Sequence, residues 1–270
     1  MNEIKVLSRE SFLAKIQTKL AVQKIRSIYK GKINIKYSSS IGDKDNSSKA
    51  WEKHGFGIFT NSLTEELLLK NTNIVVHSFK DLPVKSSKKT SFVCLERDDP
   101  RDIVLIKNSS LKKKKLVLAT SSPRRRYYLR LLKDYLPYKS FKAATIRGNI
   151  QTRLKNILES GKHDGVFMAK AAIDRVFKYG EKVDQKEFKR FKYLFNEFEK
   201  IILPISEFPS AAAQGCIALE YRNDDIKTQR ILKKINHVAS LNDCFLERKY
   251  LAKWGGGCSL DIGVTIEELH

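Results

Sequence analysis

Residues 116–132 read LVLATSSPRRRYYLRLL, and this stretch indicates the fold class of the protein. The apolar run from Leu116 to Ala119 predicts a buried strand, and the leucines that follow Arg126 predict a helix. Pro123 fits the first turn of that helix, because a backbone N–H at this position has no helical partner. A strand that passes through a short polar turn into a helix is the building unit of an α/β sheet.

The same unit recurs along the chain. Apolar strands are predicted at 4–7, 74–76, 140–144 and 165–168, and a polar turn follows each of them. Three of these turns lead directly into amphipathic helices, the first of which has Ser11 as a candidate capping residue. No repeat of the solenoid kind accompanies the pattern. The sequence therefore predicts an α/β fold.

Arginines gather where the predicted strands end and the helices begin. Arg9, Arg124, Arg147, Arg153 and Arg175 all follow predicted strands in this way. Ligands of α/β proteins bind at this edge of the sheet, and the planar guanidinium group matches carboxylates and phosphates. The pattern indicates anion sites, although an ion pair with its neighbour Glu10 is an equally simple interpretation of Arg9.

Asp81 follows the predicted strand 74–76, next to Lys80 and shortly before Pro83. Pro83 keeps the residue before it, Leu82, extended. A carboxylate at such a position can hold a cation or transfer a proton. Without further support, a turn aspartate beside a lysine is the simpler interpretation.

The net charge of +22 is large for 270 residues. It can reflect nucleic-acid binding, a lysine-rich composition without functional meaning, or a polyanionic small ligand. Lysines cluster in runs at 112–115 and 186–192, as on a solvated face, whereas the arginines lie beside Ser, Thr and Gly in short motifs. This segregation favours discrete anion sites. The sequence contains no helix-turn-helix, zinc-finger or RNA-binding signature.

A length of 270 residues predicts two or three domains. No apolar run reaches the roughly 18 residues of a membrane-spanning helix. Met1 leads directly into a predicted strand without a signal peptide, so we expect a cytoplasmic protein. Cys94, Cys216, Cys244 and Cys258 lack metal-ligand spacing, and we expect free thiols and no metal.

Cys258 lies in the stretch WGGGCSLDIGV, residues 254–264, directly after three glycines. Glycines allow backbone shapes that expose a side chain, and Lys253 can favour the nucleophilic thiolate. A cysteine after a glycine turn is more often a small buried hydrophobic residue. The rest of the chain has to decide between these interpretations.

Six motifs together resemble those of the porphobilinogen deaminase family, also called hydroxymethylbilane synthases. They occur in family order and span nearly the whole chain: VVHSFKDLPV (75–84), ERDDPRD (96–102), ATSSPRRR (119–126), IRGNIQTRLKNI (146–157), AAAQGCIALEYR (211–222) and ERKYLAKWGGGC (247–258). The resemblance implies an enzyme that joins four porphobilinogen molecules head to tail onto a covalent dipyrromethane cofactor and releases ammonia each time. It then hydrolyses the product to hydroxymethylbilane.

The resemblance also implies the architecture. Two α/β domains similar to periplasmic binding proteins enclose a central cleft, and a small α+β domain, shortened here, carries the cofactor cysteine. We expect domain 1 at 1–98 with 201–221, domain 2 at 99–200, and domain 3 at 222–270. The implied partners are porphobilinogen and the growing pyrrole chain, without nucleic acid or membrane, and the chain is expected to be monomeric.

Residue roles follow by matching the motifs. Asp81 matches the catalytic aspartate, which stabilises positive pyrrole nitrogens and assists proton transfer, and Cys258 matches the attachment point of the dipyrromethane. The residues expected to bind cofactor or substrate carboxylates are Arg9, Ser11, Lys80, Ser122, Arg124, Arg125, Arg147, Arg153 and Arg175. Further cleft candidates are Gln17, Thr120, Ser121, Gly148 and Gln214.

The chain departs from the family pattern at several points. Phe56 replaces a lysine between two glycines, a second lysine is missing near Asn61, and Ala213 replaces a glycine. The third domain is expected to be short because the sequence ends at His270. Residues 178–200 are charged and aromatic and read as an exposed amphipathic insert or as a linker back to the first domain. Two alternatives therefore stay open: a catalytically impaired anion-binding relative, which would carry no adduct, and a nucleic-acid-binding protein, whose affinity would depend steeply on salt.

Overall fold

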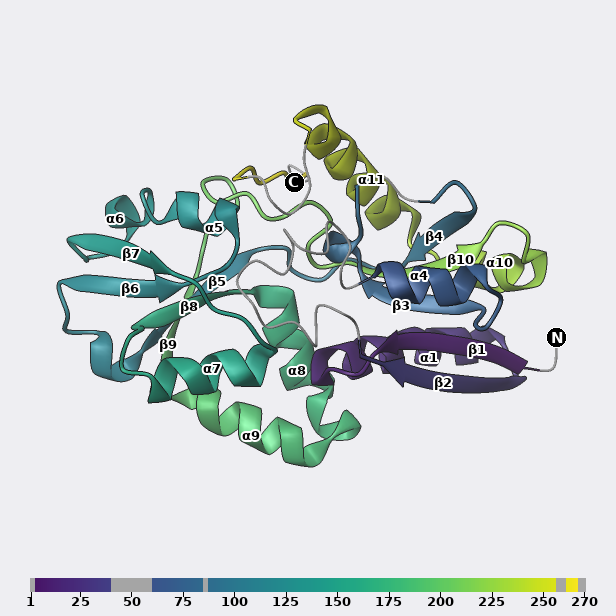
Figure 1. Ribbon diagram of the computed structural model, residues 1–270, viewed down its shortest axis with the longest axis horizontal. Helices are drawn as coiled ribbons and strands as arrows, with labels where there is room; N and C mark the ends of the chain where they lie inside the picture. Colours follow the sequence, from purple (N-terminus) through teal and green to yellow (C-terminus); the bar gives the residue numbers. More distant parts are fainter. Residues whose placement is uncertain (1–2, 40–59, 85–86, 256–260, 267–270) are drawn as a thin grey trace.

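A computed structural model describes residues 3–39, 60–84, 87–255 and 261–266. Two five-stranded sheets lie side by side, and the chain passes from one to the other and back (Figure 1). We call the first sheet and the helices on it the first lobe, and the second sheet and its helices the second lobe. Cys258 and most of the long loop expected at 38–57 lie outside the described residues.

The first sheet has the strand order β2-β1-β3-β10-β4. Strands β2, β1 and β3 are parallel, and β10 runs antiparallel to both of its neighbours. The inner strands β3 and β10 are almost wholly buried, as expected for strands covered on both faces. The bounds are β1 Glu3–Arg9, β2 Lys32–Ser38, β3 Ile74–Ser78, β4 Thr90–Cys94 and β10 Ile217–Arg222.

The second sheet has the strand order β7-β6-β8-β5-β9 and the same arrangement of directions. Strands β7, β6 and β8 are parallel, and β5 is antiparallel to β8 and β9. The predicted strands at 116–119, 140–144 and 165–168 are confirmed here. The bounds are β5 Asp102–Lys107, β6 Lys115–Ala119, β7 Ser140–Ala144, β8 Gly165–Ala169 and β9 Phe198–Ile202.

Helices cover both sheets. On the first lobe lie α1 (Phe12–Ile28), α4 (Asn61–Leu68), α10 (Ile226–Lys233) and α11 (Val238–Lys253). On the second lobe lie α5 (Pro123–Tyr128), α6 (Leu132–Tyr135), α7 (Ile150–Glu159), α8 (Lys170–Val183) and α9 (Gln185–Asn196). Single 3-10 turns follow β3 in the first lobe, at η1 (Phe79–Asp81), and β5 in the second, at η2 (Asn108–Ser110). Ser11 caps α1 as predicted, and Thr60 precedes α4.

Helix α1 contributes to the hydrophobic cores of both lobes. Phe12 and Ile16, near its start, pack into the core of the second lobe, and Val22 and Ile25 pack into that of the first. Helix α8 of the second lobe lies against it (Figure 1). The beginning of α1 is therefore held between the lobes, which matters because Arg9 and Ser11 directly precede it.

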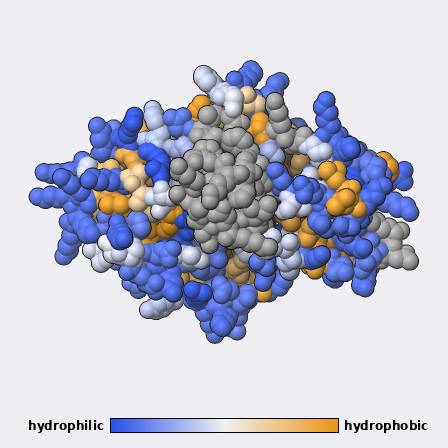
Figure 2. Space-filling model, in the orientation of Figure 1, coloured by the Kyte–Doolittle hydropathy of each residue, from blue (hydrophilic) through white to orange (hydrophobic). Residues whose placement is uncertain are grey.

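Residues 178–200 are amphipathic as predicted, but the interpretation of this segment as an exposed insert or linker is wrong. Helix α9 buries Phe191, Leu194 and Phe195 in the core of the second lobe, and β9 pairs with β5. Its charged residues face outward, and Figure 2 shows hydrophilic side chains over α9. Ile201 and Ile202 belong to β9 and therefore to the second sheet.

The described part of 222–266 packs on the first lobe. Leu232 of α10 joins the core of the first sheet, and Cys244 of α11 packs in a cluster with β4 and β10. Residues after Cys258 contact the segment around Ser210: the Val264 N–H donates to the carbonyl of Ser210 (2.9 Å), and the Ser210 N–H donates to Thr265 Oγ1 (2.7 Å). The proposed domain boundaries stay a prediction.

Two segments connect the lobes: the first crossing, residues 95–101, and the second crossing, residues 203–216. They touch each other where the Asp98 N–H donates to the carbonyl of Gly215 (3.1 Å). Gly215 has φ +93°, and a Cβ there would lie 2.3 Å from the Asp98 carbonyl oxygen, so only glycine fits. Among the described residues, no helix is long and apolar enough to span a membrane.

Candidate active site

A cleft of about 820 Å³ lies between the two lobes. The first lobe contributes the end of β1, the start of α1 and the η1 turn, and the second contributes the starts of α7 and α8. The sequence-predicted residues that line it are Arg9, Ser11, Gln17, Lys80, Asp81, Arg125, Arg147, Gly148, Arg153, Arg175 and Gln214. Residues from distant parts of the chain are thus brought together around one space.

A second cavity, of about 220 Å³, adjoins the first. The two share Lys80, Asp81, Arg125, Arg153 and Gln214. The remaining predicted residues, Thr120, Ser121, Ser122 and Arg124, line the second cavity. Every predicted site residue that the structure describes therefore lines one cavity or both, with Asp81 where they meet.

The cleft is cationic. Among its described lining residues, eight are Lys or Arg and four are Asp or Glu. Burial, followed by the charges of Arg125 and Arg147, lowers the pKa of Arg153 to about 10. Like charges in a partly desolvated space repel one another, so an anionic ligand would stabilise the site.

Lys80 and Asp81 are presented by the η1 turn, directly after β3. The Lys80 ammonium donates to Gln214 Oε1 (3.0 Å). Burial lowers the pKa of Lys80 to about 8, and the opposing effect of Asp81 does not compensate for it. Asp81 is partly exposed and faces both cavities. A carboxylate beside cations, open to the cleft, can stabilise a positive charge on a ligand or accept a proton.

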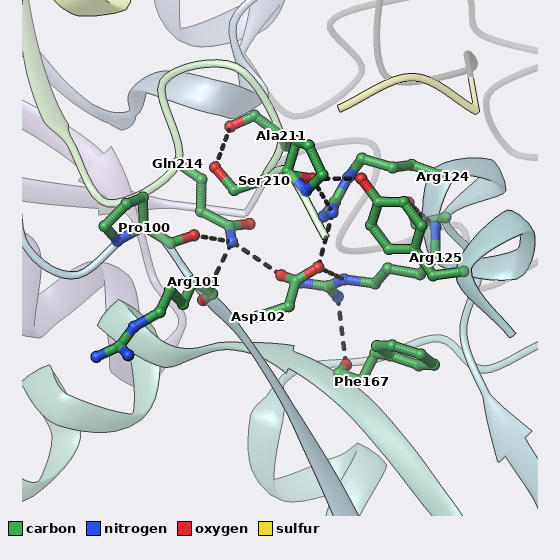
Figure 3. Close-up of polar contacts among 12 residues, drawn as sticks. Pro100, Arg101, Asp102, Arg124, Arg125, Phe167, Ser210, Ala211 and Gln214 are labelled. Carbon is green, nitrogen blue, oxygen red and sulfur yellow. Dashed lines mark hydrogen bonds and ion pairs between the residues drawn. The ribbon is translucent and has the colours of Figure 1, made fainter. Parts of the chain in front are cut away.

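Asp102, the last residue of the motif ERDDPRD, is the central structural acid of the site (Figure 3). Its buried carboxylate pairs with Arg124 (2.8 Å) and, through both oxygens, with Arg125 (2.8 and 3.2 Å). Gln214 Nε2 also donates to it (2.8 Å). Burial alone favours the neutral acid, but the two arginines outweigh it and hold the pKa of Asp102 well below its usual range.

Ion pairs with Asp102 therefore hold the side chains of Arg124 and Arg125 in place, and both residues are buried. Arg124 also donates to the carbonyl of Pro209 (2.9 Å), and Arg125 to that of Phe167 (3.3 Å). Arg175 is held in a similar way by Asp98 (2.7 Å) and by the carbonyl of Gly215. These contacts bind the second lobe to both crossings and orient the guanidinium groups beside the cavities.

The hydroxyl groups after β6 serve local structure. Thr120 Oγ1 accepts from the Ser122 N–H (3.1 Å), Ser121 donates to the carbonyl of Ile146 (2.5 Å), and Ser122 caps α5 by accepting from the Arg125 N–H (3.5 Å). The predicted helix start is confirmed, but α5 has only six residues. The arginine side chains, not the end of a long helix, carry the positive charge here.

Sequence reasoning missed Asp102, Glu247 and Arg248. Glu247 of α11 is fully buried, pairs with Arg97 of the first crossing (2.7 Å) and accepts the Ala213 N–H of the second (2.7 Å). Acidic and basic residues stand out in the motifs ERDDPRD and ERKYLAKW, but the pairing of Arg97 with Glu247, 150 residues apart, has no local signal.

The site fits a polyanion better than a neutral ligand. Its two cavities are joined at Asp81, arginines line both, and Ile262, four residues after Cys258 in sequence, lines the second. A dipyrromethane with its acetate and propionate groups has the charge that this lining complements. The fold and site thus define a two-lobed α/β protein that binds a carboxylate-rich ligand between its lobes.

Comparison with known proteins identifies the family. Residues 4–230 match the family model described as porphobilinogen deaminase, dipyromethane cofactor binding domain. The chain belongs to the porphobilinogen deaminase family. The resemblance stated from the motifs, the α/β fold class and the dipyrromethane cofactor are thereby confirmed.

Several curated relatives align over nearly the whole chain. A probable porphobilinogen deaminase of Picrophilus torridus is 35% identical over 97% of this chain and 84% of its own length. Porphobilinogen deaminases of Parasynechococcus marenigrum and Fusobacterium nucleatum are 30% and 32% identical, over 98% and 95% of this chain and 79% and 80% of their own. Among solved structures, the aliphatic sulphonate binding protein SsuA of Escherichia coli aligns with a TM-score of 0.45, at 11% identity, over 94% of this chain and 71% of its own.

Proposed function

We propose that this chain is a porphobilinogen deaminase that works through the cleft between its lobes. The observation that carries the proposal is the position of Asp81, an acid of the first lobe, opposite the arginines of the second lobe in one cationic space. The substrate is porphobilinogen, followed by the growing chain of pyrroles. One chain builds the whole cleft, so we propose a monomer as the working unit, and its cytoplasmic location stays a prediction.

Asp81 is the proposed catalytic residue. When porphobilinogen loses ammonia, a positive charge develops on the pyrrole that remains. The Asp81 carboxylate, at the junction of the two cavities, would stabilise that charge and take part in the proton transfers at the reacting pyrrole. Held on a turn directly after a buried strand, it needs little reorganisation during the reaction.

Cations on both sides of Asp81 are the proposed carboxylate ligands. Each pyrrole carries two carboxylates, so the ligand gains negative charge as it grows, and several separate cations are needed. Arg9, Arg147 and Arg153 lie in the larger cavity and are oriented by the ends of β1 and the start of α7. Asp102 anchors Arg124 and Arg125, and Asp98 anchors Arg175. These three arginines would bind ligand carboxylates through the guanidinium N–H groups that the ion pairs do not use.

Cys258 is the proposed attachment residue for the dipyrromethane. When bound, this cofactor supplies the pyrrole end to which the first substrate is joined. The described residues on either side of the cysteine are held in place: α11 precedes it, and 262–266 follows it on the second crossing. The cleft arginines would fix the cofactor carboxylates, and the second cavity would keep them close to Asp81.

The intact mass of the denatured protein tests this function. The wild-type chain should be heavier than its sequence mass by two linked pyrrole units, because the cofactor is covalent. The Cys258→Ser variant should show the bare sequence mass. Cys94→Ser is the matched control, since it removes a buried thiol in the first lobe and should keep the adduct.

Incubation with porphobilinogen extends the measurement. Further pyrrole units should then add to the wild-type mass and hydroxymethylbilane should be released. A wild-type chain that stays at its bare mass after this incubation would refute the proposal and favour a binding-only relative. An adduct that survives in Cys258→Ser would place the attachment elsewhere.

A further inference from the structure

Arg248 of α11 binds the turn that carries Asp81. Its guanidinium group donates to the carbonyls of Phe79 (3.4 Å), Leu82 (3.2 Å) and Pro83 (2.5 Å). Arg248 is only 5% exposed, so these contacts form away from bulk water. The three carbonyls stand on both sides of Asp81 in the chain, and one side chain therefore holds the backbone before and after the proposed catalytic residue.

The turn needs such a partner. η1 is a single 3-10 turn, in which the Leu82 N–H donates to the carbonyl of Phe79 (3.2 Å). The carbonyls of Leu82 and Pro83 lie beyond the end of this turn, and Pro83 has no N–H to continue it. Buried carbonyls require hydrogen-bond donors. The rigid fork of an arginine can satisfy several at once and fix their relative positions, which a lysine cannot do.

The other residues of the turn are also held. Phe79 is fully buried between Phe92 and Phe245, both with ring centroids 5.7 Å away, and the Arg248 guanidinium lies over its ring at 5.1 Å. Lys80 bonds to Gln214. The Asp81 side chain is left to face the cleft, and its position depends on the backbone that Arg248 binds.

We propose that Arg248 is a positioning residue for the reaction. It fixes the Asp81 carboxylate relative to α11, the helix that leads to Cys258 ten residues later in the sequence. The proposed catalytic acid and the segment that carries the cofactor are thus both held in place relative to α11. The inference rests on the proposed roles of Asp81 and Cys258. Arg248 also lines the second cavity, but its proposed role is to act on Asp81 through the backbone of η1.

The kinetic test compares Arg248→Met with Arg222→Met. Arg222 is the matched control, because it also donates to two backbone carbonyls of the first lobe, Leu67 (2.9 Å) and Thr72 (2.8 Å), at a distance from η1 along the chain. Displacing a catalytic group by about 1 Å can cost about 100-fold in rate. We expect Arg248→Met to lower kcat per cofactor-loaded molecule about 10- to 100-fold with little change in KM. Arg222→Met should keep kcat, and Arg248→Lys should fall between the wild type and Arg248→Met.

A double-mutant cycle asks whether Arg248 acts through Asp81. In an Asp81→Asn background, the carboxylate to be positioned is gone, so Arg248→Met should lower the residual single-turnover rate less than about twofold. Full additivity of the two effects would overturn the inference, because independent sites add. A wild-type kcat in Arg248→Met, in an enzyme that forms hydroxymethylbilane, would overturn it as well.

Backbone hydrogen exchange gives a readout that does not depend on catalysis. In the Cys258→Ser background, Arg248→Met should speed amide exchange in peptides covering residues 77–84, because their backbone loses its anchor. Arg222→Met should leave these peptides unchanged. Unchanged exchange in Arg248→Met would refute the anchoring itself, whatever the fate of the proposed function, whereas an inactive wild type with the expected exchange would refute only the function.

Discussion

The two lobes share one strand arrangement but bring different chemistry to the cleft. In each lobe, three parallel strands are joined by an antiparallel fourth, and the chain enters that strand directly after a crossing: β5 after the first crossing and β10 after the second. The first lobe contributes the acid, Asp81, and the second contributes most of the arginines. The comparison teaches that topology places the polar turns, while their sequences set the chemistry.

The lobes also differ in how they hold their cations. Arg124 and Arg125 of the second lobe converge on the buried Asp102, whereas Lys80 of the first lobe bonds to a neutral amide, Gln214. An arginine pair with its own counter-ion keeps its charge at any physiological pH. Burial lowers the pKa of Lys80 to about 8, so its charge is sensitive to pH, and this contrast can be tested.

Removing the acid of the first lobe should have the largest effect. We expect Asp81→Asn to lower kcat at least about 100-fold, because a positioned acid–base group typically contributes 10²–10⁴-fold. The fold should be kept, since Asp81 is partly exposed. Steady-state kinetics with porphobilinogen measures the effect.

Asp224→Asn is the control for that variant, because Asp224 is an exposed acid of the same lobe, paired with Lys70 and Arg222. It should retain wild-type kcat. Near-normal turnover in Asp81→Asn would show that Asp81 is not the catalytic residue. The first lobe would then not contribute the catalytic acid that distinguishes it from the second.

Removing the structural acid of the second lobe should mainly affect stability. Asp102→Asn leaves two buried guanidinium groups without their counter-ion, and breaking a buried pair in this way costs about 3–5 kcal/mol. Denaturant unfolding measures the loss. The partly exposed Asp99–Arg101 pair is the control, and Asp99→Asn should cost at most about 1 kcal/mol. Equal losses in the two variants would show that Asp102 does not anchor the arginines.

The smallest effect concerns pH and Lys80. Because burial lowers the pKa of Lys80 to about 8, its charge is lost as the pH rises through 8, while the substrate carboxylates stay ionised. KM for porphobilinogen should rise roughly tenfold between pH 7 and 9, because a tenfold change corresponds to the free energy that one hydrogen bond to a charged group contributes. Lys80→Arg should flatten this rise, since arginine stays protonated. A KM that rises equally in both proteins would assign the titration to another group.

The lowered pKa of Lys80 also determines whether the free energy of unfolding rises or falls with pH. The unfolded chain keeps the Lys80 proton up to about pH 10.4, whereas the folded chain releases it near 8. Between these values the unfolded state binds more protons, so the free energy of unfolding should rise with pH. Thermal unfolding of wild type and Lys80→Met across this window measures the contribution of Lys80.

Much of the fold was predictable because its signals are local. Apolar runs marked strands such as β3, β6 and β8, and the capping residue Ser11 marked the start of α1, since both patterns depend on neighbours within a few residues. The family motifs also named the polar residues that line the cavities. The amphipathic character of α9 was also predicted, but its packing was not, because a local pattern does not show which distant residues cover the aromatic face.

The sequence by itself determined the α/β class, the polar turns and the family. Only the tertiary structure decided which charges meet: Asp102 with the two arginines, Glu247 with Arg97, and Arg248 with the Asp81 turn. These partners lie between about 20 and 170 residues apart in the chain. A periodic pattern records which face of an element is buried, but it carries no information about which distant element covers that face, and so the pairing of buried charges appears only when the chain is folded.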